Sequence, residues 1–213
     1  MEKNLKVTIN KAGEEDILPI VEAHLLSFSD YFLTSLGGYF LALYYRSFLS
    51  SDDHLILVAR VENKVCGFVA GTIHERELFQ NILVKLKENW CGFAVVLAIK
   101  FLINSNFRRE IWERLAYMRR LKKTLSKSRS KIKAYNKMTA TLYSIAVLDE
   151  LRGKGISVSL MRKFEEEMRK KGVTICTLGV RDDNLRAIRF YRKMGWQEET
   201  RRGTTVFFIK SLI

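Results

Sequence analysis

The sequence of 213 residues is poor in proline and cysteine, with one proline and three cysteines. The cysteines, Cys66, Cys91 and Cys176, are odd in number and lack the close spacing of metal ligands. The three histidines do not cluster with them, so we expect no metal site. We expect three buried, reduced thiols, as is usual for a cytoplasmic protein.

The sequence also lacks an apolar run long enough to cross a bilayer. The strongest candidate is Cys91–Ile99, continued past Lys100, and spanning takes about 20 apolar residues. This run therefore predicts a buried helix or an interfacial one. The first residues lack the apolar core of a signal peptide, which again favours a cytoplasmic location.

Acidic residues are in short supply. The chain has 37 Lys and Arg against 23 Asp and Glu, a formal net charge of +14. Such a balance favours an anionic partner: a phosphate-bearing ligand, nucleic acid or an anionic membrane. The length and the 47% hydrophobic content suit one domain over residues 1–213 that carries an insertion.

Alternating and continuous apolar runs predict strands, and apolar residues at helical spacing predict helices. The predicted strands are Leu5–Asn10, His54–Val61, Val65–Ile73, Met138–Leu148, Val173–Val180, Trp196–Glu199 and Thr204–Ser211. The predicted helices are Glu14–Phe28, Leu36–Leu49, Gly155–Lys171 and Asn184–Met194. This order indicates an α/β fold with a mixed sheet and one parallel pair at its centre.

Residues 75–137 differ in character from the rest of the chain. They hold 16 Lys and Arg against five Glu, so they supply +11 of the net charge. Their apolar residues recur at helical spacing: Leu78, Ile82, Leu86, Ile111, Leu115, Met118 and Leu121. We predict a basic insertion of two or three amphipathic helices between the third and fourth strands, ending in the tract Lys122–Lys133.

A glycine-rich turn follows the fourth predicted strand. Arg152-Gly153-Lys154-Gly155 leads directly into a helix. Glycines let a ligand approach the backbone, and the free N–H groups of a first helical turn bind phosphate. The Lys-Ser/Thr ending of a P-loop and the third glycine of a dinucleotide fingerprint are both missing. From these residues alone, a phosphate site and a plain glycine-rich turn both remain open.

Two segments together resemble the GCN5-related N-acetyltransferase (GNAT) superfamily. The first resembles its acetyl-CoA-binding motif, Arg/Gln-x-x-Gly-x-Gly/Ala, with Arg152, Gly155 and Ser157 at the three defined positions. The second, from Asn184 to Trp196, is similar to the next motif of the family. Ser157 departs from the pattern: its hydroxyl adds a phosphate contact, or its extra atoms crowd the pyrophosphate.

The resemblance implies a fold and a donor substrate. The fold is a GNAT-like mixed central sheet flanked by helices, in which two parallel strands part to hold acetyl-CoA. The backbone of Ile145, Ala146 and Val147 would pair with the pantetheine arm. The pyrophosphate would be bound at Arg152 and at the N–H groups of the turn: Gly153, Lys154, Gly155, Ile156 and Ser157. Asn184 would contact the pantetheine end, or it only caps its helix.

The resemblance also implies direct acetyl transfer, with no covalent intermediate on Cys176. Tyr191 is the expected general acid, which protonates the departing thiolate; the alternative is a purely structural aromatic residue. Backbone N–H groups near Ile145–Val147 are placed to polarise the thioester carbonyl. Candidates for the general base are His74, Glu75 and Tyr143.

The acceptor is less defined by the sequence. We expect a primary amine of a small molecule, an anionic one such as an amino sugar. The insertion is interpreted as a solvated helical cap, as a lid for an anionic acceptor, or as an interfacial element with Trp90, Phe93, Phe101 and Trp112 in the headgroup region. The alternative function is a basic binding module on a non-catalytic scaffold. Nucleic acid is disfavoured, because no recognised motif supports it; a homodimer is compatible with the sequence.

Overall fold

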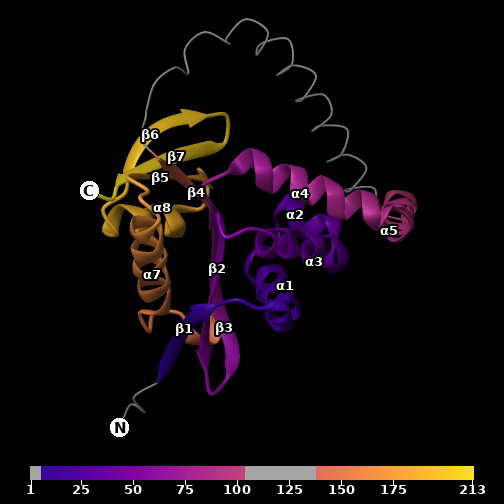
Figure 1. Cartoon of the computed structure of the whole chain (residues 1–213), viewed down its shortest axis with the longest axis horizontal. Helices are drawn as coiled ribbons and strands as arrows, with labels where there is room; N and C mark the ends of the chain where they lie inside the picture. The colour runs from indigo at the N-terminus through magenta and orange to yellow at the C-terminus, as the bar shows by residue number, and fades with distance from the viewer. Residues whose placement is uncertain (1–5, 104–137) are drawn as a thin grey trace, which may run out of the picture.

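Seven strands join in one mixed sheet in the computed structural model, which describes residues 6–103 and 138–213 (Figure 1). The strands are β1 Val7–Lys11, β2 His54–Val61, β3 Lys64–Thr72, β4 Thr139–Val147, β5 Ile175–Arg181, β6 Gln197–Arg202 and β7 Thr205–Ser211. Their order is β1-β2-β3-β4-β5-β7-β6. Neighbours are antiparallel except the central pair β4 and β5, which is parallel. The predicted mixed sheet is confirmed.

Burial explains why the strands differ in composition. Residues 54–59 of β2 are all buried, because helices cover both faces of the sheet there, and this strand reads as a continuous apolar run. The edge strand β6 is polar, with the sequence Gln-Glu-Glu-Thr-Arg-Arg and five of its six residues exposed. Charged edge residues protect an open strand from pairing with other chains.

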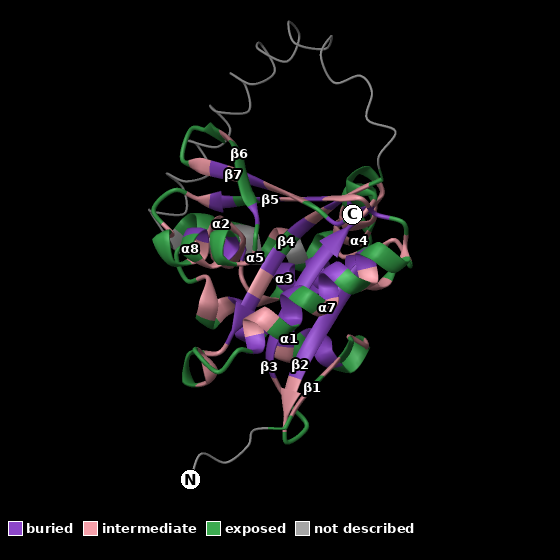
Figure 2. Ribbon diagram, turned by 90° about the vertical axis from the view of Figure 1, so that its left-hand side faces the viewer, coloured by how far each residue is buried: buried purple, intermediate pink, exposed green. Residues whose placement is uncertain are grey.

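Helices form a layer on each face of the sheet (Figure 1, Figure 2). One face carries α7 Ile156–Lys170 and α8 Leu185–Lys193, with Phe164 and Met161 at its core. The other carries α1 Ile17–Ser27, α2 Phe32–Leu36 and α3 Gly38–Arg46, with Tyr45 and Phe48 at its core. Short 3-10 turns cover Glu14–Asp16, Ser47–Leu49 and Asp149–Leu151.

The predicted helix over Leu36–Leu49 is wrong in its extent. Gly37 adopts a φ of 92°, which ends α2 at Leu36 and lets α3 start in a new direction at Gly38. Only glycine adopts such a conformation without strain. The last residues, Ser47–Leu49, tighten into a 3-10 turn.

The hairpin between β2 and β3 is tighter than the predicted three-residue turn. Glu62 and Asn63 alone form it, with φ of 50° and 65°, and Lys64 already belongs to β3. Two successive positive φ values are typical of the two-residue turns that match the twist of antiparallel strands.

β4 contains one extra residue relative to β3. Ala70 pairs with Ser144 and Gly71 pairs with Leu142, so Tyr143 has no counterpart. A β-bulge of this kind bends the strand and reverses which face its side chains enter. The core shared with α7 accordingly receives even-numbered residues before the bulge and odd-numbered ones after it: Ala140, Leu142, then Ile145 and Val147.

The parallel pairing of β4 and β5 stops at the bulge. Their register runs from Thr139 opposite Ile175 to Leu142 opposite Leu178 and goes no further. The remainder of β4 still pairs with β3 on its other side. One edge of β4, from Tyr143 to Val147, therefore faces an opening in the sheet.

Two helices follow β3, α4 Glu75–Glu88 and α5 Trp90–Ile103. Figure 1 shows them reaching away from the sheet beyond α2 and α3. The rest of the predicted insertion, residues 104–137, lies outside the described residues. That part includes Ile111, Trp112, Leu115, Met118, Leu121 and the tract Lys122–Lys133. The bounds of the insertion and the single domain over 1–213 stay predictions.

The sequence predicts a buried helix or an interfacial one for the apolar run in α5. Among the described residues, α5 is not buried. Trp90 is 61% exposed and Leu102 is 77% exposed. Cys91 is exposed too, so the expectation of three buried thiols is wrong for this residue, while Cys66 and Cys176 are buried. No helix in the described part of the chain is both long enough and apolar enough to pass through a membrane.

A buried ion pair joins α7 to β7. The Glu165 carboxylate, 4% exposed as a residue, accepts hydrogen bonds from Lys210 Nζ at 2.7 and 2.8 Å and from Trp196 Nε1 at 3.3 Å. Lys210 Nζ also donates to the Met194 carbonyl at 2.7 Å. The carboxylate thus connects α7 with the start of β6 and the end of β7, and Lys210 extends the connection to the end of α8.

Candidate active site

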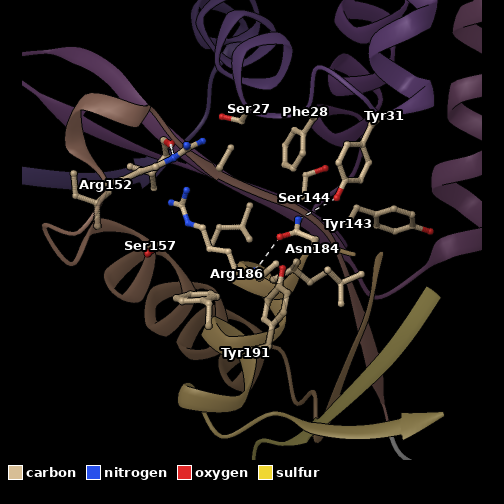
Figure 3. A pocket seen from close by; sticks show the side chains of 18 of the residues that line it. Ser27, Phe28, Tyr31, Tyr143, Ser144, Arg152, Ser157, Asn184, Arg186 and Tyr191 are labelled. Atoms are coloured by element: carbon tan, nitrogen blue, oxygen red, sulfur yellow. Dashed lines mark hydrogen bonds between the residues drawn. The ribbon is translucent and has the colours of Figure 1, made fainter. Parts of the chain in front are cut away.

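A cavity of about 360 Å³ fills the opening beside β4 (Figure 3). Its walls come from five parts of the chain: the β4 edge, the turn before α7, the end of β5, one side of α8, and the end of α1 with the loop after it. It is lined by both polar and apolar residues. An extended ligand would fit beside β4 in the place of a strand.

Nine of the eleven predicted site residues line this cavity. They are Ile145, Ala146, Val147, Arg152, Gly153, Ile156, Ser157, Asn184 and Tyr191. Lys154 and Gly155 do not line it and are exposed in the turn. The Ile156 side chain is 2% exposed and packs in the core, which leaves its backbone N–H as the group available to a ligand. The roles of these residues stay predictions.

The glycines of the turn are required by the backbone. Gly153 and Gly155 adopt φ of 81° and 80°, and a Cβ built on either would meet no atom within 4 Å. Gly155 is the N-cap residue of α7 and supplies no capping side chain. The first N–H groups of α7 therefore lack a side-chain partner beside an open space, which is the arrangement that binds phosphate.

Two arginines enter the cavity near this turn (Figure 3). Arg152 Nε donates to the Val147 carbonyl at 3.2 Å, and its Nη1 pairs with Asp149. Arg186, from the first turn of α8, lines the same cavity and has no ion pair within 4 Å among the described residues. This end of the cavity is therefore positively charged.

The Asn184 side chain makes two hydrogen bonds within the protein. Its Oδ1 accepts a hydrogen bond from the Ala187 N–H at 3.0 Å, which caps α8, and its Nδ2 donates to Tyr31 Oη at 3.1 Å. The capping alternative is therefore present in the structure. The predicted contact with pantetheine stays a prediction, although the side chain lines the cavity.

Tyr191 is both a core residue and a cavity residue. It is 6% exposed, and its ring packs against those of Trp196 and Phe208 at centroid distances of 6.0 and 5.8 Å. Burial raises the pKa of its hydroxyl, and the nearby Tyr31 raises it further. Figure 3 shows the hydroxyl directed into the cavity below Asn184. The phenol therefore keeps its proton at neutral pH and presents it to the cavity.

Aromatic residues line the opposite end from the arginines: Phe28, Tyr31 and Tyr143. Tyr143 is the bulge residue of β4 and is 42% exposed. Burial and the adjacent Glu75 carboxylate raise the pKa of its hydroxyl to about 12. The structure thus brings two of the three candidate bases, Tyr143 and Glu75, into contact.

The third candidate base lies elsewhere. His74 ends up after β3, as the residue before α4, and its Nε2 lies 3.3 Å from Asp53 Oδ2. It does not line the cavity. No group of three His, Cys, Asp or Glu side chains within residues 6–103 and 138–213 is arranged to hold a metal ion.

Sequence reasoning missed Arg186, Tyr31, Phe28 and Ser27. Arg186 stands two positions after the helix cap Asn184, and that position in a first helical turn was a usable signal. Tyr31 is 153 positions from Asn184, its hydrogen-bond partner, so only the folded chain reveals the contact.

These features define a class of protein: a mixed α/β sheet whose parted parallel strands form a slot ending at an uncapped helix N-terminus. Residues 125–196 match the model of the acetyltransferase (GNAT) family. The matched segment is about a third of the chain, and it contains the glycine-rich turn and the Asn184–Trp196 segment on which the resemblance to this family was based.

A curated relative also matches part of the chain. Ribosomal protein bS18-alanine N-acetyltransferase of Escherichia coli (strain K12) is 36% identical over 63 residues, which are 30% of this chain and 43% of that protein. The chain thus matches less than half the length of this relative.

Two solved structures share the fold over nearly the whole chain. PaiA N-acetyltransferase from Thermoplasma acidophilum, in complex with coenzyme A, has a TM-score of 0.60 at 17% identity and covers 97% of this chain and 99% of its own. The ribosomal-protein-S18-alanine N-acetyltransferase from Escherichia coli has a TM-score of 0.58 at 15% identity, covering 97% and 94%.

Proposed function

We propose that the protein is an N-acetyltransferase that moves an acetyl group from acetyl-CoA directly to a primary amine. The observation that carries this proposal is the cavity itself: an unpaired β4 edge that leads to the uncapped N-terminus of α7. A relative named an N-acetyltransferase and a similar fold in complex with coenzyme A support it.

The donor fits the cavity group by group. The pyrophosphate binds the first N–H groups of α7 and the guanidinium groups of Arg152 and Arg186. The pantetheine amides pair with the β4 edge over Ile145–Val147, where the Val147 carbonyl is already engaged by Arg152. Ser27 Oγ, buried beside the cavity, has no hydrogen-bond partner among the described residues and is available to the arm.

The transfer needs two proton movements. The amine nitrogen attacks the thioester carbonyl carbon and forms the new C–N bond, and the C–S bond then breaks with its electron pair going to sulfur. Tyr191 donates its proton to that sulfur, and a base removes one proton from the former amine nitrogen. Backbone N–H groups of β4 beyond the bulge stabilise the negative charge on the carbonyl oxygen.

We assign the base to Glu75, acting through the Tyr143 hydroxyl. Tyr143 lines the cavity and lies next to Glu75, whereas His74 pairs with Asp53 outside it. Glu75→Gln removes the proton acceptor and keeps the shape, so kcat should fall by about 10²-fold or more at neutral pH. His74→Gln is the matched control and should retain kcat within about twofold; equal losses in both variants would remove Glu75 from this role.

The acceptor is a small primary amine that enters at the aromatic end of the cavity. An anionic amino sugar, suggested by the charge of the chain, is one class to test, and a peptide with an N-terminal alanine, suggested by the relative, is another. A panel of both classes, monitored by release of the coenzyme A thiol, separates them by kcat/KM. Reaction with the anionic amino sugars but not with the alanine peptides supports the anionic class.

Calorimetry with acetyl-CoA tests the donor. We expect binding in the micromolar range and a clear loss of affinity in Arg186→Ala, because a buried phosphate contact disappears. No binding at millimolar acetyl-CoA would refute the enzyme assignment. The remaining function would then be a basic binding module on a non-catalytic acetyltransferase scaffold.

A further inference from the structure

A second tyrosine lines the cavity together with Tyr191. Tyr31 lies in the loop between α1 and α2, and Tyr191 lies in α8. Figure 3 shows the two side chains on opposite sides of Asn184, with both hydroxyl groups directed toward it. Tyr191 has a role in the proposed reaction, as the acid for the leaving thiolate. The contacts of Tyr31 show which hydrogen bond this second phenol can offer.

The proton of the Tyr31 hydroxyl is available to a ligand. Asn184 Oδ1 accepts from the Ala187 N–H at 3.0 Å, and this bond fixes which way the Asn184 amide is turned. Its Nδ2 is therefore the group that meets Tyr31 Oη, 3.1 Å away, and Asn184 is the donor in this second bond. A phenol that accepts a hydrogen bond still has its own proton to donate. No acceptor for that proton lies within hydrogen-bond distance among residues 6–103 and 138–213.

The ring of Tyr31 is held in place from two sides. The Arg181 guanidinium carbon lies 5.2 Å from the centroid of this ring, and Arg181 Nη1 donates to the Asp30 carbonyl at 3.2 Å. The Phe28 ring packs against it in an edge arrangement, at a centroid distance of 5.3 Å. A cation over an aromatic face and an edge-to-face pair are both stabilising. Tyr31 Oη is therefore fixed in position before a ligand binds, which is what electrostatic stabilisation of a reacting group requires.

The position of Tyr31 along the cavity matches the reacting end of the donor. Arg152 and Arg186 lie at one end of the cavity and Tyr31 lies at the other. With the pyrophosphate at the arginines, as proposed above, the thioester lies toward Tyr31 and Tyr191. Burial and then the nearby Tyr31 raise the pKa of the Tyr191 hydroxyl, so the two phenol oxygens are close enough to interact electrostatically. The thioester sulfur and the carbonyl oxygen are attached to the same carbon, so a donor close to Tyr191 can reach that oxygen.

We propose that Tyr31 donates a hydrogen bond to the thioester carbonyl oxygen, while Tyr191 gives its proton to the sulfur. This inference rests on the proposed acetyl transfer. Attack by the amine forms the C–N bond and moves one electron pair of the C=O bond onto oxygen, where the hydrogen bond from Tyr31 strengthens as negative charge develops. The pair then returns to the carbonyl as the C–S bond breaks. Tyr31 keeps its proton throughout, so its role differs from that of Tyr191.

Infrared spectroscopy of the bound donor tests this hydrogen bond without an acceptor. Acetyl-CoA with an isotope label at the thioester carbonyl carbon gives a C=O band that can be assigned. A hydrogen bond to the oxygen weakens the C=O bond, so we expect the band at lower wavenumber in the unaltered protein than in Tyr31→Phe. Tyr39→Phe is the matched control, because the Tyr39 hydroxyl also bonds an asparagine, Asn89 Oδ1 at 3.3 Å, but lies outside the cavity. Its band should coincide with that of the unaltered protein.

Affinity, turnover and a second variant complete the test. Tyr31→Phe should keep the acetyl-CoA dissociation constant within about threefold, and with any amine that reacts its kcat should fall by about 10²-fold. Asn184→Asp keeps an oxygen acceptor for the Ala187 N–H and offers another oxygen to Tyr31, which draws the Tyr31 proton away from the ligand. Its band should therefore shift as it does in Tyr31→Phe. Circular dichroism reports the folding of each variant.

The outcomes separate this inference from the proposed function. A band that stays in place in both Tyr31→Phe and Asn184→Asp overturns the hydrogen bond to the carbonyl, while acetyl-CoA binding and the proposed function stand. A loss of affinity without a change in band position overturns it as well, because Tyr31 would then serve binding alone. Absence of acetyl-CoA binding by the unaltered protein refutes the proposed function and this inference together.

Discussion

Tyr191 combines burial with access to the cavity, and this combination sets its chemistry. Its ring is fixed between Trp196 and Phe208, while burial keeps its hydroxyl protonated. In the proposed reaction the leaving thiolate would need a proton from a group at a fixed position, and this phenol would supply it.

Tyr191→Phe removes the hydroxyl and little else. We expect kcat to fall by about 10²-fold or more, since general acid catalysis typically contributes that much, and the acetyl-CoA dissociation constant to stay within about threefold. Tyr39→Phe is the control, because Tyr39 is also a tyrosine but lies outside the cavity. Steady-state kinetics with calorimetry decides the matter: unchanged turnover in Tyr191→Phe excludes the acid role.

His24 predicts a pH dependence of stability. It is 2% exposed, its Nδ1 bonds Tyr45 Oη at 2.7 Å, and burial lowers the pKa of its imidazole to about 4. The ring stays neutral in the folded protein, while the unfolded chain takes up a proton below about pH 6.5. The free energy of unfolding is therefore fully retained above pH 6.5 and falls toward pH 4, by about 3 kcal/mol from this residue.

Urea unfolding between pH 7.5 and 4.5 checks the effect, with His24→Asn for comparison. Asparagine keeps a hydrogen-bonding atom near Tyr45 but has no proton to gain, so the slope of the variant should be shallower. Some slope should remain, because burial lowers the pKa of His54 as well. Parallel slopes in the two proteins would exclude His24 as a source.

At the scale of elements, the turn before α7 is the part that the proposed donor would contact. Gly153 lines the cavity with a φ of 81°, and Gly203 in the β6–β7 turn has a φ of 58° outside it. A Cβ at either position would meet no atom within 4 Å. The two glycines are thus alike in backbone conformation and surrounding space, and differ in their distance from the proposed site.

Alanine at these two positions separates strain from ligand contact. Both Gly153→Ala and Gly203→Ala should lower the free energy of unfolding by about 1–2 kcal/mol, the cost of a left-handed conformation. Only Gly153→Ala should also weaken acetyl-CoA binding, by about tenfold, since its Cβ occupies space beside the pyrophosphate. Thermal denaturation and calorimetry of the pair measure the two effects, and equal affinities in both variants would argue against a pyrophosphate at this turn.

Elements were predicted well where the local signal was strong. β2 is a continuous apolar run and α8 begins at a capping asparagine, and both were found close to their bounds. The bulge at Tyr143 had no local signal, because it is defined by the register with β3. Glu75 reaches Tyr143 only through the turn from β3 into α4, so the sequence suggested both residues but not their contact.

At the scale of the whole molecule, the Glu165–Lys210 pair connects elements that are distant in sequence. The two residues are 45 positions apart, and no local sequence pattern predicts their contact. Because the pair is buried, removing one partner should destabilise the fold by leaving the other charge unpaired in the core.

Glu165→Ala should lower the free energy of unfolding by about 3–5 kcal/mol, because Lys210 and the Trp196 N–H lose their acceptor in the core. Replacing both residues by methionine removes the charges together, so the double variant should lose less than half as much. Chemical denaturation of the two variants gives the comparison. A double variant as unstable as the single one would show that the loss comes from packing rather than from an unpaired charge.

The bulge in β4 makes the length of this strand part of the site. If Tyr143 were kept but paired regularly, Thr139 and Thr141 would turn into the core beside α7, and Leu142 would turn out of it. The strand could then either keep its apolar side chains in the core or keep its edge open beside the cavity, but not both. Deletion of Tyr143 would leave the same side chains of β4 in the core, so the extra residue serves the opening beside the strand and not the core.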